Sequence, residues 1–387
     1  MAIKPSYIKI NPKVLEWARE SIGLQPLEVS KRLNISENTV IAWEEGNKAP
    51  STSSLNKLAS FYKRPLAALL LPSVPDEPPL PTDFRQLPNL QKHRLSKETR
   101  LSIRRARRYQ RFAIELSEYE SAELSDNVIL GSATLQDDPE SISERERNRI
   151  GISVGDQSKL RDPYEALREW RRSLEKLNVL VFQTKFPLEE ARGFSLCDRK
   201  IPVIVLNMSD SVNPRIFTIF HEYAHIMLGQ TGICIPTEAP TEFEQHDQAE
   251  EFCDAFAGAF LVPESSIIED SIALNIRKDS YIDEDAIKQL VNKYRVSQYV
   301  ILRRLLSCNL ITKGNYSDYL NNIEIPVRKK TKRGPSVARK SIAQNGILFT
   351  SLALSAVNHG YINYSDLSDY LNIKLKHLDS VEKLVRQ

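Results

Sequence analysis

The sequence predicts a mostly helical chain that contains one small α+β domain. Residues 26–45 have the spacing of two short helices joined by a tight turn, and a His-Glu-x-x-His run at 221–225 lies in an apolar, helix-compatible segment. Residues 342–384 again favour helix. At 387 residues the chain is too long for one domain. We therefore expect an all-α helix-turn-helix domain, an α+β domain around the His-Glu-x-x-His helix, and a C-terminal helical segment.

The N-terminal helix pair has recognisable start and stop signals. Pro26 favours the beginning of a helix that reaches Leu33. After a short turn, Ser36 is suited to cap a second helix, which runs to Glu45 and stops at Gly46. Six apolar side chains should fill the small core of this domain: Leu27, Val29, Leu33, Ile35, Val40 and Trp43.

This segment resembles the Xre and lambda-repressor type of DNA-binding domain, notably in residues 35–40 (Ile-Ser-Glu-Asn-Thr-Val) and 43–46 (Trp-Glu-Glu-Gly). The resemblance implies that the second helix of the pair reads bases in the major groove of duplex DNA. It implies base contacts by Glu37, Asn38, Thr39 and Ala42, and phosphate contacts by Lys31, Arg32 and Lys48.

The modest positive charge of this domain favours weak DNA binding over strong DNA binding. Residues 1–70 hold ten Lys/Arg and six Asp/Glu, a net charge of +4, but the second helix contributes Glu37, Glu44 and Glu45 and no base. Because phosphate neutralisation supplies most of the affinity for DNA, we expect weak and strongly salt-dependent binding. A homodimer would bind more tightly and is compatible with the sequence. The alternative is a helix-turn-helix domain retained for binding protein.

A proline-rich connector at 71–81 cannot be helical and predicts that the modules on either side fold separately. After it, residues 97–111 hold seven bases and one acid, which indicates either a nucleic-acid surface or a solvated helix paired with acids such as Glu115 and Glu118. Residues 328–340 hold seven bases and no acid, typical of a basic linker that contacts DNA or the acidic part of the chain. We therefore expect five segments: the helix-turn-helix domain at 1–71, the proline-rich linker at 72–95, the basic helical segment at 96–147, the α+β domain at 148–325, and the basic linker with the C-terminal helices at 326–387.

The α+β domain is predicted from a helix and three short strands ahead of the apolar helix. Residues 164–177 favour helix, and residues 179–183, 193–197 and 202–206 favour strands. A strand beside a cleft could hold a peptide by edge pairing. Residues 203–206 are apolar throughout, which is equally typical of a buried core strand with no substrate role.

His221, Glu222 and His225 form the zinc metallopeptidase motif His-Glu-x-x-His. On an α-helix, residues four apart are rotated by only about 40°, so both imidazoles project from one face and can hold one Zn²⁺. Glu222 lies beside them and is placed to accept a proton from a water at the metal. The same short pattern also arises by chance in structural helices, so its context decides.

A catalytic zinc site needs a third protein ligand, and residues 249–262 offer one on a second helix, which Pro263 ends. Glu250 could reach the metal, and Asp254, one turn later on the same face, could fix a ligand imidazole through its free ring nitrogen. Glu251 is the competing ligand and faces away. An acidic helix start would equally explain either glutamate alone. The buried stripe of this helix should contain Phe252, Ala255, Phe256 and Ala259.

Together these motifs resemble those of the ImmA/IrrE family of zinc metallopeptidases. The likeness rests on residues 221–225, 250–257 and 261–263, with Cys253 in place of the usual alanine, and covers roughly residues 160–325. It implies a zincin-like fold, the zinc ligands His221, His225 and Glu250, and Glu222 as catalytic base. Members of the family typically cut, or help to inactivate, helix-turn-helix repressors in mobile-element, stress-response and DNA-damage circuits.

The remaining composition narrows the class of protein. The net charge is only +3, no apolar stretch approaches the roughly 20 residues of a membrane span, and the first residues lack a signal peptide's apolar run, so we expect a cytoplasmic protein. The four cysteines have no CxxC spacing, as expected for reduced thiols, and Cys253 is best explained by buried packing. His246, which precedes the second motif, is the one further candidate site residue and could stabilise an oxyanion, but a surface position is the better explanation. No internal repeat is apparent.

Two hypotheses of different kinds follow. The first is a zinc endopeptidase fused to a DNA-binding domain, whose substrate is a protein, expected to be a helix-turn-helix repressor of a phage, toxin-antitoxin or stress-response circuit. The second is a transcriptional regulator or antitoxin whose peptidase-like domain senses a ligand or binds a partner without catalysis. The intact His-Glu-x-x-His motif with its downstream glutamate favours the first.

Overall fold

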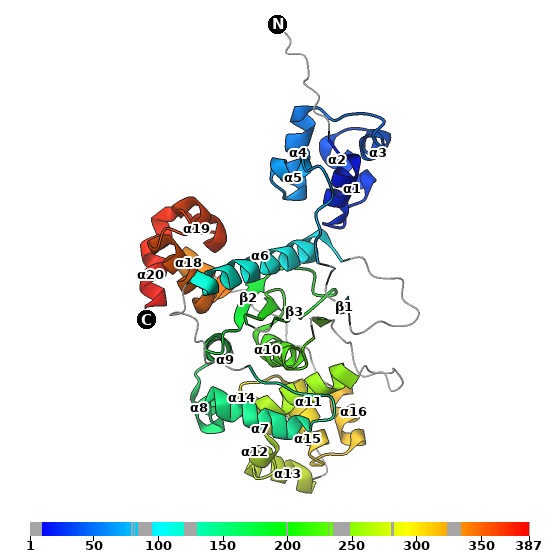
Figure 1. The fold of residues 1–387 in the computed structure, drawn as a ribbon. Coiled ribbons are helices and arrows are strands. Elements are labelled where there is room, and N and C mark those ends of the chain that lie inside the picture. Colours follow the sequence, from blue (N-terminus) through cyan, green and yellow to red (C-terminus); the bar gives the residue numbers. More distant parts are fainter. Residues whose placement is uncertain are drawn as a thin grey trace. The chain divides into compact units, whose positions relative to one another are not determined.

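The chain folds as two compact units, comprising residues 1–80 with 89–104, and residues 81–88 with 105–387 (Figure 1). The second unit thus includes most of the expected basic helical segment together with the α+β domain and the C-terminal helices. Helix α6 (Lys97–Tyr119) contributes residues to both units. The computed structural model describes residues 10–78, 80, 82–83, 95–119, 130–198, 200–230, 232–234, 248–279, 282–322 and 334–386, so His246 and residues 328–333 lie outside the described residues.

The first unit confirms the predicted helix pair. Asn34 ends the first helix in the left-handed conformation (φ 57°), and the hydroxyl of Ser36 accepts a hydrogen bond from the Thr39 backbone N–H at 3.2 Å, which caps the second helix. The helices of this unit are α1 (Pro12–Glu20), α2 (Pro26–Leu33), α3 (Glu37–Glu44), α4 (Thr52–Tyr62) and α5 (Leu66–Leu69).

The predicted core of the first unit is correct except at one residue. Val29, Val40 and Trp43 are buried, and Leu33 and Ile35 pack against them while partly buried. Leu27 is 46% exposed, so its assignment to the core was wrong. Residues two positions apart on an α-helix are rotated by about 200°, which turns Leu27 away from the face that Val29 buries.

A five-stranded mixed sheet organises the second unit, in the strand order β1-β5-β3-β4-β2. Its strands are β1 (Thr82–Asp83), β2 (Leu180–Thr184), β3 (Gly193–Leu196), β4 (Val203–Asn207) and β5 (Gly232–Cys234). Strand β4 pairs parallel to β2 and antiparallel to β3, and β5 pairs antiparallel to β3 and parallel to β1. Every residue of β4 is buried, so this strand has the core role, one of its two interpretations.

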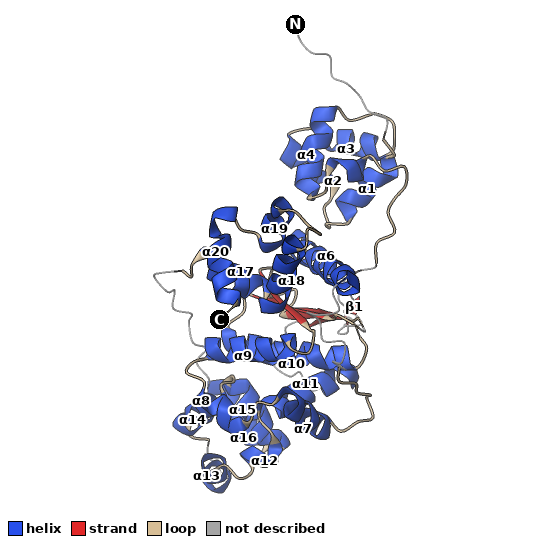
Figure 2. Cartoon of the chain, turned by 60° about the vertical axis from the view of Figure 1, so that its left-hand side comes forward, coloured by secondary structure: helices blue, strands red, loops and turns tan. Residues whose placement is uncertain are grey.

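Helices cover both faces of the sheet, as Figure 2 shows. Helices α9 (Pro163–Glu175) and α10 (Val212–Met227) lie on one face, and α6 and α18 (Ile347–Asn358) lie on the other. On the second face the ring of Tyr109 from α6 stacks on Phe349 of α18 at 4.4 Å and meets Phe182 of β2 edge-on at 5.4 Å. These contacts bind the segment after residue 104 and the C-terminal helices to the sheet.

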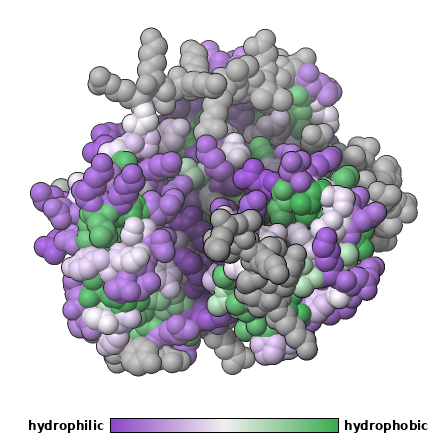
Figure 3. All heavy atoms as spheres, turned by 90° about the horizontal axis from the view of Figure 1, so that it is seen from above, coloured by the Kyte–Doolittle hydropathy of each residue, from purple (hydrophilic) through white to green (hydrophobic). Residues whose placement is uncertain are grey.

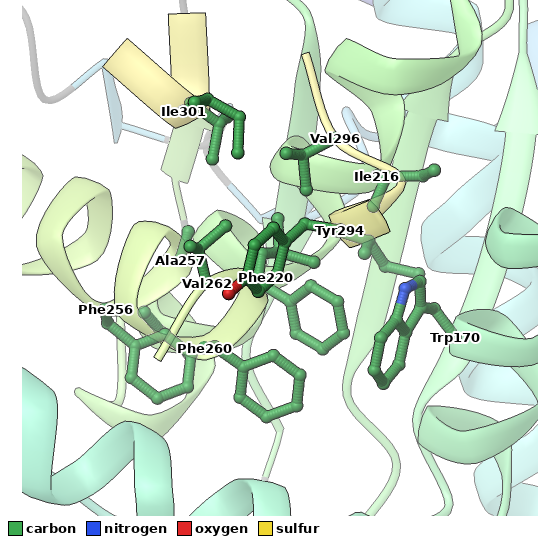
Figure 4. Close-up of a cluster of buried hydrophobic side chains, with 14 of the residues drawn as sticks. Trp170, Ile216, Phe220, Phe256, Ala257, Phe260, Val262, Tyr294, Val296 and Ile301 are labelled. Atoms are coloured by element: carbon green, nitrogen blue, oxygen red, sulfur yellow. The ribbon is translucent and has the colours of Figure 1, made fainter. Parts of the chain in front are cut away.

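The remaining helices pack outside α9 and α10 or around α18. Around α10, the Phe220 ring stacks on Phe260 at 4.0 Å and meets Trp170 edge-on at 5.1 Å, which joins three helices in one core (Figure 4). The helices are α7 (Pro139–Ile150), α8 (Val154–Lys159), α11 (Gln248–Leu261), α12 (Glu264–Ile267), α13 (Ser271–Asp279), α14 (Glu284–Tyr294), α15 (Gln298–Ser307), α16 (Lys313–Asn322), α17 (Val337–Asn345), α19 (Tyr364–Leu371) and α20 (Leu378–Val385), with a short 3₁₀-helix at Leu375–His377.

Buried polar side chains of α9 and of strand β2, which is an edge of the sheet, fasten the C-terminal helices to this part of the unit. Arg171 and Gln183 both donate to the backbone carbonyl of Ala343 in α17, at 2.9 and 2.8 Å. The buried Glu175 carboxylate accepts the backbone N–H groups of Ile347 and Leu348 at 3.1 and 3.4 Å and so caps α18. An exposed strand edge invites pairing with other chains, and α17 covers this one.

Several bases of the 97–111 run contact groups that the sequence analysis did not consider. Arg104 donates to the carbonyls of Tyr62 and Lys63, the latter at 2.6 Å, and Arg105 donates to Asn345 at 2.9 Å. Arg108 lies 4.9 Å from the ring centroid of Tyr370. Much of this basic run therefore serves packing through carbonyl oxygens and aromatic rings.

None of the described helices is long and apolar enough to cross a membrane. On the face drawn in Figure 3, hydrophobic residues form separate patches among hydrophilic ones.

Candidate metal centre

The centre begins with the local geometry of α10, a helix of sixteen residues that starts after Ser211. Its apolar sequence buries it between the sheet and α11, and its spacing places His221 and His225 on one face, with Nε2 atoms 3.2 Å apart. Both imidazoles are buried.

Glu250 completes the group from the first turn of α11, which packs along α10. Its Oε2 lies 3.4 Å from His221 Nε2 and its Oε1 lies 3.2 Å from His225 Nε2. Burial alone would raise the pKa of Glu250, but the hydrogen bonds and charges of the two histidines outweigh it, so the pKa is lowered and the carboxylate form is favoured. The three residues thus present two nitrogens and an ionised carboxylate to one point.

These distances suit a zinc ion. Tetrahedral ligands at the usual zinc distances of about 2.0–2.1 Å stand about 3.3 Å from one another, close to the separations found here. Among the described residues, His221, His225 and Glu250 are the group of metal-binding type whose ligand atoms converge, all within 4.8 Å. Two histidines and one glutamate with a remaining open position form the donor set of catalytic zinc.

Asp254 lies one turn beyond Glu250, with Oδ1 2.9 Å from His221 Nδ1. Its other oxygen, Oδ2, accepts a bond from Arg303 of α15 at 3.2 Å. The second histidine has a weaker partner, since His225 Nδ1 and Gln230 Oε1 are 3.4 Å apart. A carboxylate on Nδ1 fixes the ring so that Nε2 faces the ligand cluster.

Glu222 is fully buried beside the cluster, and neither of its carboxylate oxygens has a hydrogen-bond partner among the described residues. Burial raises its pKa, although His225 and His221 oppose the shift. An unpartnered buried carboxylate is costly, and a water held at a metal would supply its missing partner. The residues present therefore fit a hydrated metal ion.

Strand β3 approaches α10 closely at Gly193. A Cβ at this position would lie 2.6 Å from the Thr218 Cγ2 atom and 3.5 Å from Glu222 Oε1, so only glycine permits the approach. Ser195, the next residue on the same side of the strand, is also buried. Glu222 is thereby confined between a strand and its own helix.

Neighbouring residues of α11 separate clearly into buried and exposed sides. Glu251 is exposed, and Cys253 is buried in the core, where burial raises the pKa of its thiol and disfavours the thiolate form that binds metals. Ala255 is also exposed, so its assignment to the buried stripe was wrong. Phe252, Phe256 and Ala259 define the buried face, and Ala255 lies about 100° from Phe256, on the side of Glu251.

The residues assigned to DNA contact lie in the first unit. Lys31, Arg32, Asn38 and Lys48 are exposed, whereas Glu37, Thr39 and Ala42 are partly buried. The hydroxyl of Thr39 is 2.8 Å from that of Ser36 and shares in the helix cap.

The negative charge on α3 is smaller at the surface than its sequence suggests. Glu44 is buried and forms a two-point ion pair with Arg19 of α1, both bonds 2.8 Å long. Its charge holds the helices of this unit together and does not face a DNA phosphate. The negative charge that this helix exposes to solvent is therefore smaller by one.

Arg303 and Gly193 belong to the surroundings of the centre but do not stand out in the sequence. Arg303 lies far along the chain from Asp254 and reaches it only because α15 packs against α11. A basic residue on an amphipathic helix carried no distinguishing signal. Gly193 had a weak signal, because a glycine inside a strand often marks a close approach.

Asp254→Ala should lower zinc affinity by about 10 to 100-fold, because His221 loses the acceptor that fixes its ring. Arg303→Ala should have a smaller effect in the same direction, since it acts only by holding Asp254 and its side chain is 61% exposed. Competition of each variant with a zinc chelator measures both. Equal zinc affinity in Asp254→Ala and the unmodified protein would contradict the assignment.

Comparison with known protein families agrees with both parts of this description. Residues 174–306 match the model of the IrrE N-terminal-like domain, and residues 15–69 match the Helix-turn-helix model. No curated protein matches the chain. The two matches place the metal-binding group and the α2–α3 pair inside their respective domains. The chain therefore joins a helix-turn-helix domain of the Xre type to a metallopeptidase-type domain of the ImmA/IrrE kind.

Proposed function

We propose that the protein is a zinc-dependent endopeptidase joined to a DNA-binding domain, and that it cuts or otherwise inactivates a repressor protein. One observation carries the proposal: His221, His225 and Glu250 converge beside a buried carboxylate, Glu222, that has no other described partner. A structural helix has no need for four buried polar side chains at one point, because burying them costs stability.

The chain's residues divide the chemistry between them. Bound zinc would polarise the scissile carbonyl and lower the pKa of a water molecule. His221, His225 and Glu250 would hold the ion, and Asp254 keeps the His221 ring turned toward it. Glu222 accepts a proton from the water and passes it to the leaving amine, and its two carboxylate oxygens have no described partner that would compete with that water.

The proposed substrate class rests on the family resemblance and on the presence of a helix-turn-helix domain in the same chain. Its resemblance to the ImmA/IrrE family implies a helix-turn-helix repressor as substrate, in a phage, toxin-antitoxin or stress-response circuit. The chain's own helix-turn-helix domain would bring the peptidase to DNA where such a repressor is bound. Weak binding of that domain would suffice, because attachment to one DNA molecule raises the local concentration of enzyme around the substrate.

Two neighbouring glutamates provide the test. Purified protein should contain about one zinc per chain and should cut a repressor encoded beside its gene. Glu250→Ala should lose zinc and cleavage together, whereas the exposed Glu251→Ala should keep both. Metal analysis and gel electrophoresis of the repressor read the outcome. Zinc loss from Glu251→Ala instead would refute this ligand set, and full zinc without cleavage of any neighbouring repressor would favour the sensor hypothesis.

A further inference from the structure

The C-terminal helices α18, α19 and α20 repeat the backbone plan of α1, α2 and α3. In both places an asparagine in the left-handed conformation ends the middle helix: Asn34 with φ 57° and ψ 53°, and Asn372 with φ 51° and ψ 48°. Each middle helix is eight residues long. In both, the next helical turn begins three residues after the asparagine, although at Leu375 it starts as a 3₁₀-helix.

Matching hydrogen bonds extend the likeness. The backbone N–H of Ile373 donates to the backbone carbonyl of Ser368 at 3.1 Å, as that of Ile35 does to the carbonyl of Ser30 at 3.1 Å. The preceding turns also agree, since Gly23 and Gly360 have φ angles of +73° and +76°. The sequence identity that accompanies this geometry includes one continuous run, Leu33-Asn34-Ile35 and Leu371-Asn372-Ile373.

The buried positions correspond as well. Counted from the asparagine, the core residues stand five before, six after and nine after in both copies. They are Val29, Val40 and Trp43 in the first unit, and Leu367, Leu378 and Val381 in the second. With these core positions matched, Lys376 and Lys383 fall at the positions of Asn38 and Glu45, which are exposed in both copies.

The exposed residues differ in charge between the two copies. Residues 36–45 of the first contain three glutamates and no base, whereas residues 374–383 of the second contain Lys374, Lys376 and Lys383 against two acids. All three lysines are exposed. Lys376 stands at the position of Asn38, which the first copy would present to bases.

Helix α17 brings further bases to this region. Ser341 and Asn345 of α17 both donate to the carbonyl of Leu371, at 2.8 and 3.2 Å, so α17 lies beside the turn that leads to α20 (Figure 2). Arg339 and Lys340 of α17 are exposed, and α17 carries no acid. A helix that carries two exposed bases and no acid is thus packed beside the turn that contains Lys374 and Lys376.

We propose that α20 and the turn before it form a second DNA-binding element, in which Lys374 and Lys376 contact duplex DNA. Helix-turn-helix units place their last helix in the major groove, and phosphate neutralisation supplies most of the binding free energy. Residues 374–383 supply bases for this neutralisation that α3 lacks, whereas exposed Asp369 stands at the position of Lys31, so the neutralisation rests on the turn and α20 and not on α19. Dispersed exposed lysines are common on protein surfaces, but here Lys376 stands at a base-facing position of a helix-turn-helix backbone, and Lys374 lies two residues before it in the turn.

A third helix pair shows that the backbone alone does not make such a site. Arg295 (φ 54°) joins α14 to α15 in the same left-handed manner. Half of α15 is buried, however, including Val300 and Leu305, and its exposed Arg303 is engaged by Asp254. Only Leu378 and Val381 are buried in α20, which leaves its other residues accessible.

The experiment uses the full chain with its first DNA-binding domain disabled by Lys31→Ala, Arg32→Ala and Asn38→Ala. This variant should still bind a fluorescent duplex DNA, as measured by anisotropy at several salt concentrations. Adding Lys374→Ala and Lys376→Ala should weaken the binding at low salt by about 10-fold and reduce the slope of log K against log salt by about 2. The matched control adds Lys185→Ala and Lys313→Ala, two exposed lysines of the same unit, and should change neither quantity appreciably.

Circular dichroism melting checks that each variant is folded. If the Lys374 and Lys376 pair costs no more affinity than the control pair, the proposal is overturned and the C-terminal surface is left for a protein partner. The assay contains no peptide substrate, so failure of the proposed peptidase function would leave this result unaffected.

Discussion

Glu222→Gln should keep its zinc and its fold while losing about 10² to 10⁴-fold in the rate of repressor cleavage, the usual contribution of a positioned acid-base group. Glutamine has the size of glutamate and can still hydrogen-bond, but it cannot accept a proton from water at neutral pH. Neither carboxylate oxygen of Glu222 has a described hydrogen-bond partner at bonding distance, and the nearby Ser195 hydroxyl can face a glutamine as well as a glutamate, so the substitution breaks no established bond. Single-turnover cleavage, zinc content and melting temperature measure the three parts of the expectation.

Glu251→Gln is the matched control, because Glu251 carries the same side chain on the exposed face of α11. It should cleave the repressor at the unmodified rate. In cells that lack another copy of the protein, the Glu222 variant should leave its target repressor intact under inducing conditions. Normal regulation by that variant would remove the peptidase from the mechanism and favour ligand sensing or partner binding.

The centre could be predicted from sequence to the extent that its geometry is local to one helix. His221 and His225 share a face because of their spacing, and the same rule puts Glu250 and Asp254 together on a second helix. The need of a catalytic zinc for a third protein ligand linked the two helices, and the family resemblance implied the same ligand set. What brings Arg303 to Asp254 is the packing of α15 on α11, which no short-range pattern encodes.

The errors and omissions in the fold have a similar cause. Leu27 and Ala255 are apolar residues in amphipathic helices. Periodicity indicates the direction of the apolar face of a helix, but not how much of that face the neighbouring elements cover. The likeness of α18–α20 to α1–α3 is not apparent from the sequence, because only Leu-Asn-Ile recurs as a continuous run. Many different apolar residues can fill equivalent core positions on the same backbone. The likeness is therefore visible in the backbone angles and buried positions.

Gly346→Ala should destabilise the second unit by about 3 kcal/mol, the upper end of the usual cost of a strained residue. Gly346 has φ 80° and ψ 167°, a conformation essentially limited to glycine. A Cβ there would also overlap the carboxylate of Glu175 and crowd the carbonyl of Val181 at 3.1 Å. The substitution therefore disturbs both the backbone and the group that caps α18.

Chemical denaturation measures this loss, with Gly151→Ala as control. Gly151 also has a positive φ, +74°, but has open space around its Cβ position, so its substitution should cost only about 1–2 kcal/mol. Equal losses in the two variants would mean that Glu175 does not hold the C-terminal helices in place. Zinc content should be unchanged in folded Gly346→Ala, because the metal ligands lie on α10 and α11.

The bonds from Arg171 and Gln183 to Ala343 also set an order of events during synthesis of the chain. They join residues separated by 172 and 160 positions, so strand β2 leaves the ribosome long before α17 can cover its edge. Contacts this distant in sequence slow folding, and an uncovered strand edge can pair with other chains in the meantime. Aggregation of newly made protein should therefore be greatest between the appearance of residue 184 and that of residue 343, the interval in which a chaperone would be most useful.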